Sequence, residues 1–131
     1  MSTTLRAGLI GAGFIGSVHA HAIRSSGAQL TRVSDSTSDR AAEAAQRLGA
    51  LAPAESAEAL ITSDDVDVVH ICTPNVTHAA LAQMAIAAGK SVVCEKPLAT
   101  SVADADRLVA LAERAGVVAA VPFVYRYYPT V

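Results

Sequence analysis

Tryptophan is absent from this sequence of 131 residues, and cysteine and aromatic residues are scarce. Two cysteines, Cys72 and Cys94, are too few for a disulfide framework, and each ends an apolar run, so we expect two reduced, buried thiols in a cytoplasmic protein. No apolar run approaches the roughly 18 residues of a membrane-spanning helix. The net charge of −2, without any basic cluster, argues against nucleic acid as a partner.

Hydrophobic residues, by contrast, make up 52% of the chain, and many of them are alanine. Apolar runs typical of strands alternate with helical patterns. The predicted strands are 5–10, 29–34, a short one from 51, 66–72, 91–94 and 117–121. The predicted helices are 14–25, 38–48, 54–61, 76–88 and 101–115. This alternation predicts an α/β fold: a doubly wound parallel sheet of about six strands in the Rossmann order 3-2-1-4-5-6, with residues 1–121 as one domain.

A glycine-rich turn joins the first predicted strand to the first predicted helix. Gly11 permits a tight turn, Gly13 lets a pyrophosphate approach the backbone, and Gly16 allows the helix to pack closely on the strand. The free N–H groups of the helix N-terminus favour phosphate. The loop therefore predicts a dinucleotide site, with a ligand-free turn and a methyltransferase loop as the alternatives.

An acidic residue, Asp35, follows the second strand, 19 positions after Gly16. An acid at about this spacing bonds the adenosine ribose hydroxyls and repels the extra phosphate of NADP, which favours NAD. Arg40 and the nearby hydroxyl side chains could hold the extra phosphate, so NADP remains an alternative cofactor. The alternative is an aspartate that caps a turn or helix.

Two further motifs follow strands at the same predicted sheet edge, where ligands of open α/β sheets bind. Residues Thr73 to Asn75 follow the fourth strand, either to contact the cofactor or only to begin a helix. Glu95, Lys96 and Pro97 follow the fifth. We expect a lysine there to be partly desolvated and to stabilise developing alkoxide charge. A surface salt bridge is the alternative.

With these motifs the sequence resembles the amino-terminal domain of the Gfo/Idh/MocA family of oxidoreductases. The segments that carry the resemblance are GLIGAGFIGSVHAHAI, the acid in VSDSTSDRAAEAA, CTPNVTHAALAQMAIAAGKSVVCEKPLA and FVYRYYP. The resemblance implies hydride transfer between NAD(P) and a sugar- or polyol-type hydroxyl, with Lys96 as the catalytic lysine. The expected cofactor-binding residues are Gly11, Gly13, Phe14, Ile15, Gly16, Asp35, Arg40, Thr73, Pro74, Asn75, His78, Glu95, Lys96, Pro97 and Arg126.

Family members carry a second domain with most substrate contacts, which implies that this chain is an amino-terminal fragment, inactive alone. Residues 122–131 would then begin the crossover to that carboxy-terminal domain, and the full-length protein would be a homo-oligomer. A non-catalytic module that binds or senses NAD(H) is the alternative. No metal site is expected, since His19 and His21 lie on different faces of a helix.

Overall fold

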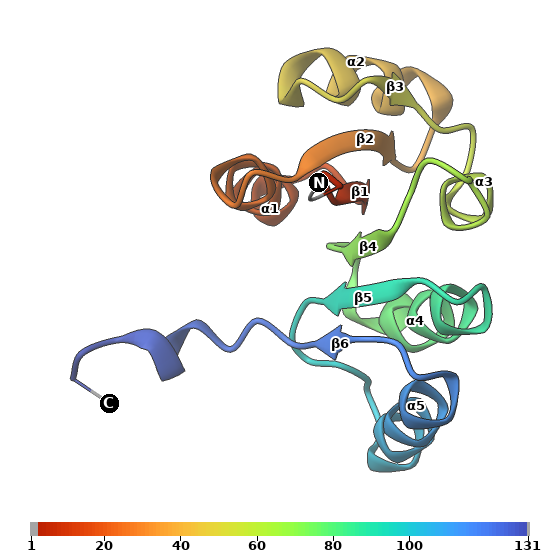
Figure 1. Cartoon of the computed structure of the whole chain (residues 1–131), viewed down its shortest axis with the longest axis vertical. Coiled ribbons are helices and arrows are strands. Elements are labelled where there is room, and N and C mark those ends of the chain that lie inside the picture. Colours follow the sequence, from red (N-terminus) through yellow and green to blue (C-terminus); the bar gives the residue numbers. More distant parts are fainter. Residues whose placement is uncertain (1–2, 131) are drawn as a thin grey trace.

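A computed structural model describes residues 3–130, and its centre is a six-stranded parallel sheet (Figure 1). The strands are β1 (Arg6–Ile10), β2 (Gln29–Ser34), β3 (Ala52–Pro53), β4 (Val68–Ile71), β5 (Ser91–Cys94) and β6 (Ala119–Ala120). Their order, β3-β2-β1-β4-β5-β6, confirms the predicted topology. Because β1 lies between β2 and β4, the chain winds away from β1 in both directions, and a crevice opens at the carboxyl end of this switch point.

Helices cover both faces of the sheet. They are α1 (Phe14–Ser25), α2 (Ser38–Leu48), α3 (Ala57–Ile61), α4 (His78–Ala87) and α5 (Val102–Ala115), with short 3-10 turns η1 (Asn75–Thr77) and η2 (Val124–Tyr127). One apolar cluster joins the sheet to α1 and α2, and a larger one joins it to α3, α4 and α5. The central strands are buried on both faces, which explains their runs of β-branched residues.

Several predicted elements differ in length or in type from what the sequence pattern suggested. The helix expected over 54–61 begins at Ala57, because the side chain of Ser56 accepts the backbone N–H of Ala59 and caps it. The helix expected over 76–88 is the turn η1 followed by α4. The strand expected over 117–121 pairs for only two residues, as an edge strand against β5.

The last described segment, 121–130, extends from β6 away from the body of the domain (Figure 1). Its three tyrosines and Phe123 are exposed, and the ring of Tyr125 packs edge to face on the rings of Phe123 and Tyr128. Residues 1 and 2 of the predicted domain and residue 131 of the predicted crossover lie outside the described residues. Among the helices of residues 3–130, none has the length and apolar character needed to cross a membrane.

The amino edge of the sheet carries ion pairs that the sequence pattern did not indicate. Arg6 and Asp67 join the starts of β1 and β4 through a bidentate contact of 2.6 and 3.0 Å, and Arg32 lies 2.9 Å from Asp65. The ammonium of Lys90 donates to two backbone carbonyls of the turn before β4. These contacts tie β1 and β2 to the turn before β4.

Both cysteine thiols are free, with Cys94 buried and Cys72 half-buried. Burial, reinforced by the negative charge of Glu95, raises the pKa of the Cys94 thiol to about 12 and that of Cys72 well above its usual value. The thiolate is the reactive form, so we expect alkylation at pH 8 to be at least about 100-fold slower in the folded protein than in urea. Mass spectrometry of iodoacetamide-treated protein measures this. Complete labelling of the folded chain within minutes would contradict it.

Candidate functional site

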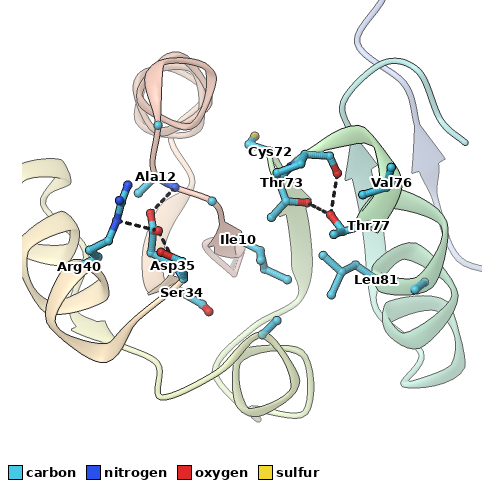
Figure 2. A pocket seen from close by; sticks show the side chains of 16 residues that line it. Ile10, Ala12, Ser34, Asp35, Arg40, Cys72, Thr73, Val76, Thr77 and Leu81 are labelled. Atoms are coloured by element: carbon cyan, nitrogen blue, oxygen red, sulfur yellow. Dashed lines mark hydrogen bonds and ion pairs between the residues drawn. The ribbon is translucent and has the colours of Figure 1, made fainter. Parts of the chain in front are cut away.

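A cleft of about 850 Å³ opens at the carboxyl edge of the sheet, at the switch point between β1 and β4 (Figure 2). It is walled by the loops that follow β1, β2 and β4, with residues of α3 and α4 below. The lining residues are Ile10, Gly11, Ala12, Gly13, Ser34, Asp35, Ser36, Arg40, Ala57, Cys72, Thr73, Pro74, Val76, Thr77, Ala80 and Leu81. Its volume and its largely apolar walls with a few polar groups suit a cofactor.

Two glycines at the start of α1 and in the loop before it, Gly11 and Gly16, are required by the local geometry. Gly11 has a φ of +89°, and a Cβ there would lie 2.6 Å from the carbonyl oxygen of Cys72. At Gly16 a Cβ would lie 2.1 Å from the carbonyl oxygen of Gly11, so only glycine lets α1 approach the loop this closely. Gly13 differs, because a Cβ there would meet nothing within 4 Å. Its exposed backbone borders the cleft and leaves room for a ligand to approach.

The N-terminus of α1 lacks a side-chain cap. Gly13 is the N-cap residue and has no side chain to accept the first-turn N–H groups. In α2 and α5, by contrast, the side chains of Thr37 and Ser101 accept such groups. The backbone donors and positive dipole end of α1 thus remain available beside the cleft, where they favour a phosphate. Phe14 and Ile15 contribute this backbone, and their side chains do not line the cleft.

Asp35 follows β2 and is fixed in the cleft wall (Figure 2). Its carboxylate accepts the backbone N–H groups of Ala12 at 3.0 Å and Ser36 at 2.6 Å, and lies 3.2 Å from Nε of Arg40. Burial by itself raises the pKa of Asp35, but the hydrogen bonds from Ser36 and Ala12 and the charge of Arg40 outweigh it, and the pKa lies below its usual value. The cleft therefore presents a fixed negative charge at this point.

Arg47, which the sequence analysis did not single out, holds the glycine loop from α2. Its guanidinium donates to the carbonyl of Ala12 at 2.7 Å and to the hydroxyl of Ser17 at 3.0 Å. The hydroxyl of Ser17 in turn lies 3.1 Å from the carbonyl of Gly13. No local motif links Arg47 to a loop 35 positions earlier, so only the packing of α2 beside α1 reveals it.

The loop after β4 contributes Thr73, Pro74 and Thr77 to the cleft wall, and the hydroxyls of Thr73 and Thr77 are 2.6 Å apart. His78 is fully buried behind this loop. Its ring nitrogens lie 2.9 Å from the carbonyl oxygen of Thr73 and 2.7 Å from that of Pro97. His78 therefore ties the loops after β4 and β5 together rather than facing the cleft as expected.

The loop after β5 lies one strand further along the same sheet edge and does not line the cleft. β5 is an interior strand, as expected, but the side chain of Lys96 is exposed, so its predicted partial desolvation is wrong for the described chain. The reason is that the loop turns outward at Lys96 and Pro97, where no described element covers it. Glu95, in contrast, is buried and forms no ion pair with Lys96 in residues 3–130.

Two further predicted cofactor contacts, Arg126 and Asn75, do not line the cleft. Arg126 is exposed in η2, within the segment that extends from the domain (Figure 1). Asn75 is exposed in η1 and is not among the lining residues. Within residues 3–130, no cluster of three or more histidine, cysteine, aspartate or glutamate side chains has the arrangement of a metal site.

A doubly wound parallel sheet with a glycine loop, an uncapped helix N-terminus and a fixed acid at its switch point defines a dinucleotide-binding domain. Residues 5–123 match the family described as "Oxidoreductase family, NAD-binding Rossmann fold", GFO_IDH_MocA. The chain belongs to this Gfo/Idh/MocA family.

Relatives support this assignment along most of the chain. D-apiose dehydrogenase of Paraburkholderia graminis is 36% identical and covers 94% of this chain, and inositol 2-dehydrogenase 3 of Saccharopolyspora erythraea is 44% identical and covers 81%. The chain spans about a third of the length of either relative, 33% and 32%.

Among the solved structures of relatives, one contains NAD and another contains NADP⁺. GenD2 from gentamicin A biosynthesis, in complex with NAD, has a TM-score of 0.90 at 34% identity over 98% of this chain and 37% of its own. Biliverdin reductase from Synechocystis, in complex with biliverdin and NADP⁺, has a TM-score of 0.84 at 34% identity over 91% of this chain and 38% of its own.

Proposed function

We propose that the 850 Å³ cleft binds NAD in preference to NADP. Asp35 carries the proposal, because its carboxylate is held in the cleft wall by two backbone N–H groups and presents negative charge where an adenosine ribose would lie. The residues fit the cofactor: the space above Gly13 is open, and the N-terminus of α1 is uncapped. Arg40 neutralises part of the charge of Asp35, so the preference is a matter of degree.

Substitution of Asp35 by alanine tests this preference. We expect NAD⁺ affinity to fall about tenfold and NADP⁺ affinity to change less, because the lost carboxylate both accepts ribose hydroxyls and repels a 2′-phosphate. Isothermal titration calorimetry with both nucleotides measures the ratio. Asp39→Ala is the control, since Asp39 is an exposed acid in the first turn of α2. An unchanged ratio in Asp35→Ala would contradict the proposal.

The proposed reaction is hydride transfer between nicotinamide and a sugar- or polyol-type hydroxyl compound in a full-length dehydrogenase. Lys96 stands at the sheet edge one strand beyond the cleft, with an exposed side chain. There its ammonium would polarise the substrate oxygen and stabilise alkoxide charge, while bound nicotinamide supplies the hydride acceptor. We place the dinucleotide-binding domain in residues 1–121 and the crossover in 122–131, and we propose that this chain alone binds cofactor without turnover.

A further inference from the structure

A polar cluster lies beside the loop after β5. It is formed by the buried residues His19 of α1 and Glu95 at the end of β5 and by the half-buried His70 of β4. Nε2 of His19 lies 3.0 Å from Oε1 of Glu95, and Nδ1 of His19 lies 3.0 Å from Nδ1 of His70. The two rings meet edge to face at 89°, with centroids 5.3 Å apart. His19 and Glu95 are both more than nine-tenths buried, so their contacts replace water.

The second carboxylate oxygen of Glu95 connects this cluster to the predicted catalytic lysine. Oε2 of Glu95 accepts the backbone N–H of Lys96 at 3.0 Å, while the backbone N–H of Glu95 itself donates to Ile71 of β4. His19 therefore holds one carboxylate oxygen of Glu95, and the other oxygen binds the backbone N–H of Lys96. Displacement of this carboxylate would break its hydrogen bond to the backbone of Lys96.

Donation from a neutral His19 to the carboxylate of Glu95 requires one particular pair of tautomers in the two histidines. When the carboxylate of Glu95 accepts from Nε2–H of a neutral His19, Nδ1 of His19 carries only a lone pair. The contact between the two Nδ1 atoms is then a hydrogen bond only if His70 donates it, which makes His70 the Nδ1–H tautomer. Burial, reinforced by His19, lowers the pKa of His70 to about 4, so that His70 is neutral at pH 7.

We propose that His19 is a positioning residue that locks Glu95, and through it the backbone of Lys96, in the orientation needed at the substrate edge. His70 fixes the His19 tautomer that donates to Glu95. This role rests on the proposed function of Lys96. It also gives Glu95 a part that differs from the cofactor contact expected from the sequence.

A matched pair of variants distinguishes the roles of the two ring nitrogens of His19. In His19→Gln, the side-chain amide nitrogen takes the approximate place of Nε2 and still donates to Glu95. In His19→Asn, the shorter amide takes the place of Nδ1, reaches His70 and leaves Glu95 without its donor. His21 lies on the exposed face of the same helix, and His21→Asn is the control.

The first measurement uses nitrogen-15 NMR of the wild-type chain without nucleotide at pH 7. We expect His19 as the Nε2–H tautomer and His70 as the Nδ1–H tautomer. The reverse pattern would mean that a protonated Glu95 donates to His19, and it would overturn the proposal. This measurement tests the proposed tautomers on the wild-type chain, so it does not depend on whether a variant folds.

The second measurement follows the amide resonance of Lys96 and the affinity for NADH. We expect His19→Asn to move the Lys96 amide far more than His21→Asn does and to weaken NADH binding about tenfold, while His19→Gln restores both nearly to wild type. Equal behaviour of the two His19 variants would overturn the proposal. If the wild type binds no NADH but the tautomers and the Lys96 amide behave as expected, the proposed function fails and the positioning role stands.

Discussion

Gly16→Ala is expected to destabilise the domain by about 3 kcal/mol, the upper end of the usual cost of overpacking, and to lower its melting temperature by roughly 10–15 °C. The added Cβ would lie 2.1 Å from the carbonyl oxygen of Gly11, which is backbone and has no rotamer with which to move aside. The glycine loop and α1 must therefore separate, and their separation opens the apolar cluster beneath α1. Urea denaturation followed by circular dichroism measures the loss.

The control for this prediction is a second glycine of the same loop. Gly13 has a φ of −72°, and a Cβ there meets nothing within 4 Å, so Gly13→Ala is expected to cost less than about 1 kcal/mol, the cost of a poorer N-cap residue. Similar losses in the two variants would show that the close contact between Gly16 and Gly11 is not what requires glycine.

Gly13→Ala is expected instead to abolish most cofactor affinity in a protein that remains folded. Its methyl group would occupy the open space beside the uncapped N-terminus of α1, where the proposed pyrophosphate approaches the backbone. A loss of about 2 kcal/mol, or roughly 30-fold in the dissociation constant for NADH, is expected. Calorimetric titration measures it, alongside the melting curve.

The outcome separates the stability of the loop from its binding role. If Gly13→Ala binds NADH as tightly as the wild type, the pyrophosphate does not lie against this backbone, and the proposed mode of binding is wrong. Gly16→Ala serves here as the comparison, because its loss of binding is expected to follow its loss of folded protein.

The sheet order and the glycine loop could be predicted from the sequence because both depend on local patterns. Alternating strands and helices determine a doubly wound topology, and the spacing from Gly16 to Asp35 reflects a single βαβ unit. The predicted strand and helix ends were less accurate, since capping residues such as Ser56 decide them.

The contacts that position the site could not be read from the sequence. His19 and His21 were correctly expected on opposite helix faces, but nothing in their spacing shows that His19 meets His70 and Glu95, 51 and 76 positions away. The same holds for Arg47 beneath the glycine loop. Exposure of Lys96 was missed for a related reason, because burial depends on which elements cover a loop and not on the strand before it.

We propose that one dinucleotide lies at the carboxyl edge of the sheet, across the switch point between β1 and β4. The most direct test is an NMR titration of the labelled chain with NADH. We expect the amide resonances of residues 11–16, 35–36 and 73–77 to shift together with a single dissociation constant. Shifts confined to the amino edge, around Arg6, Arg32 and Asp67, or no shifts at millimolar NADH, would contradict it.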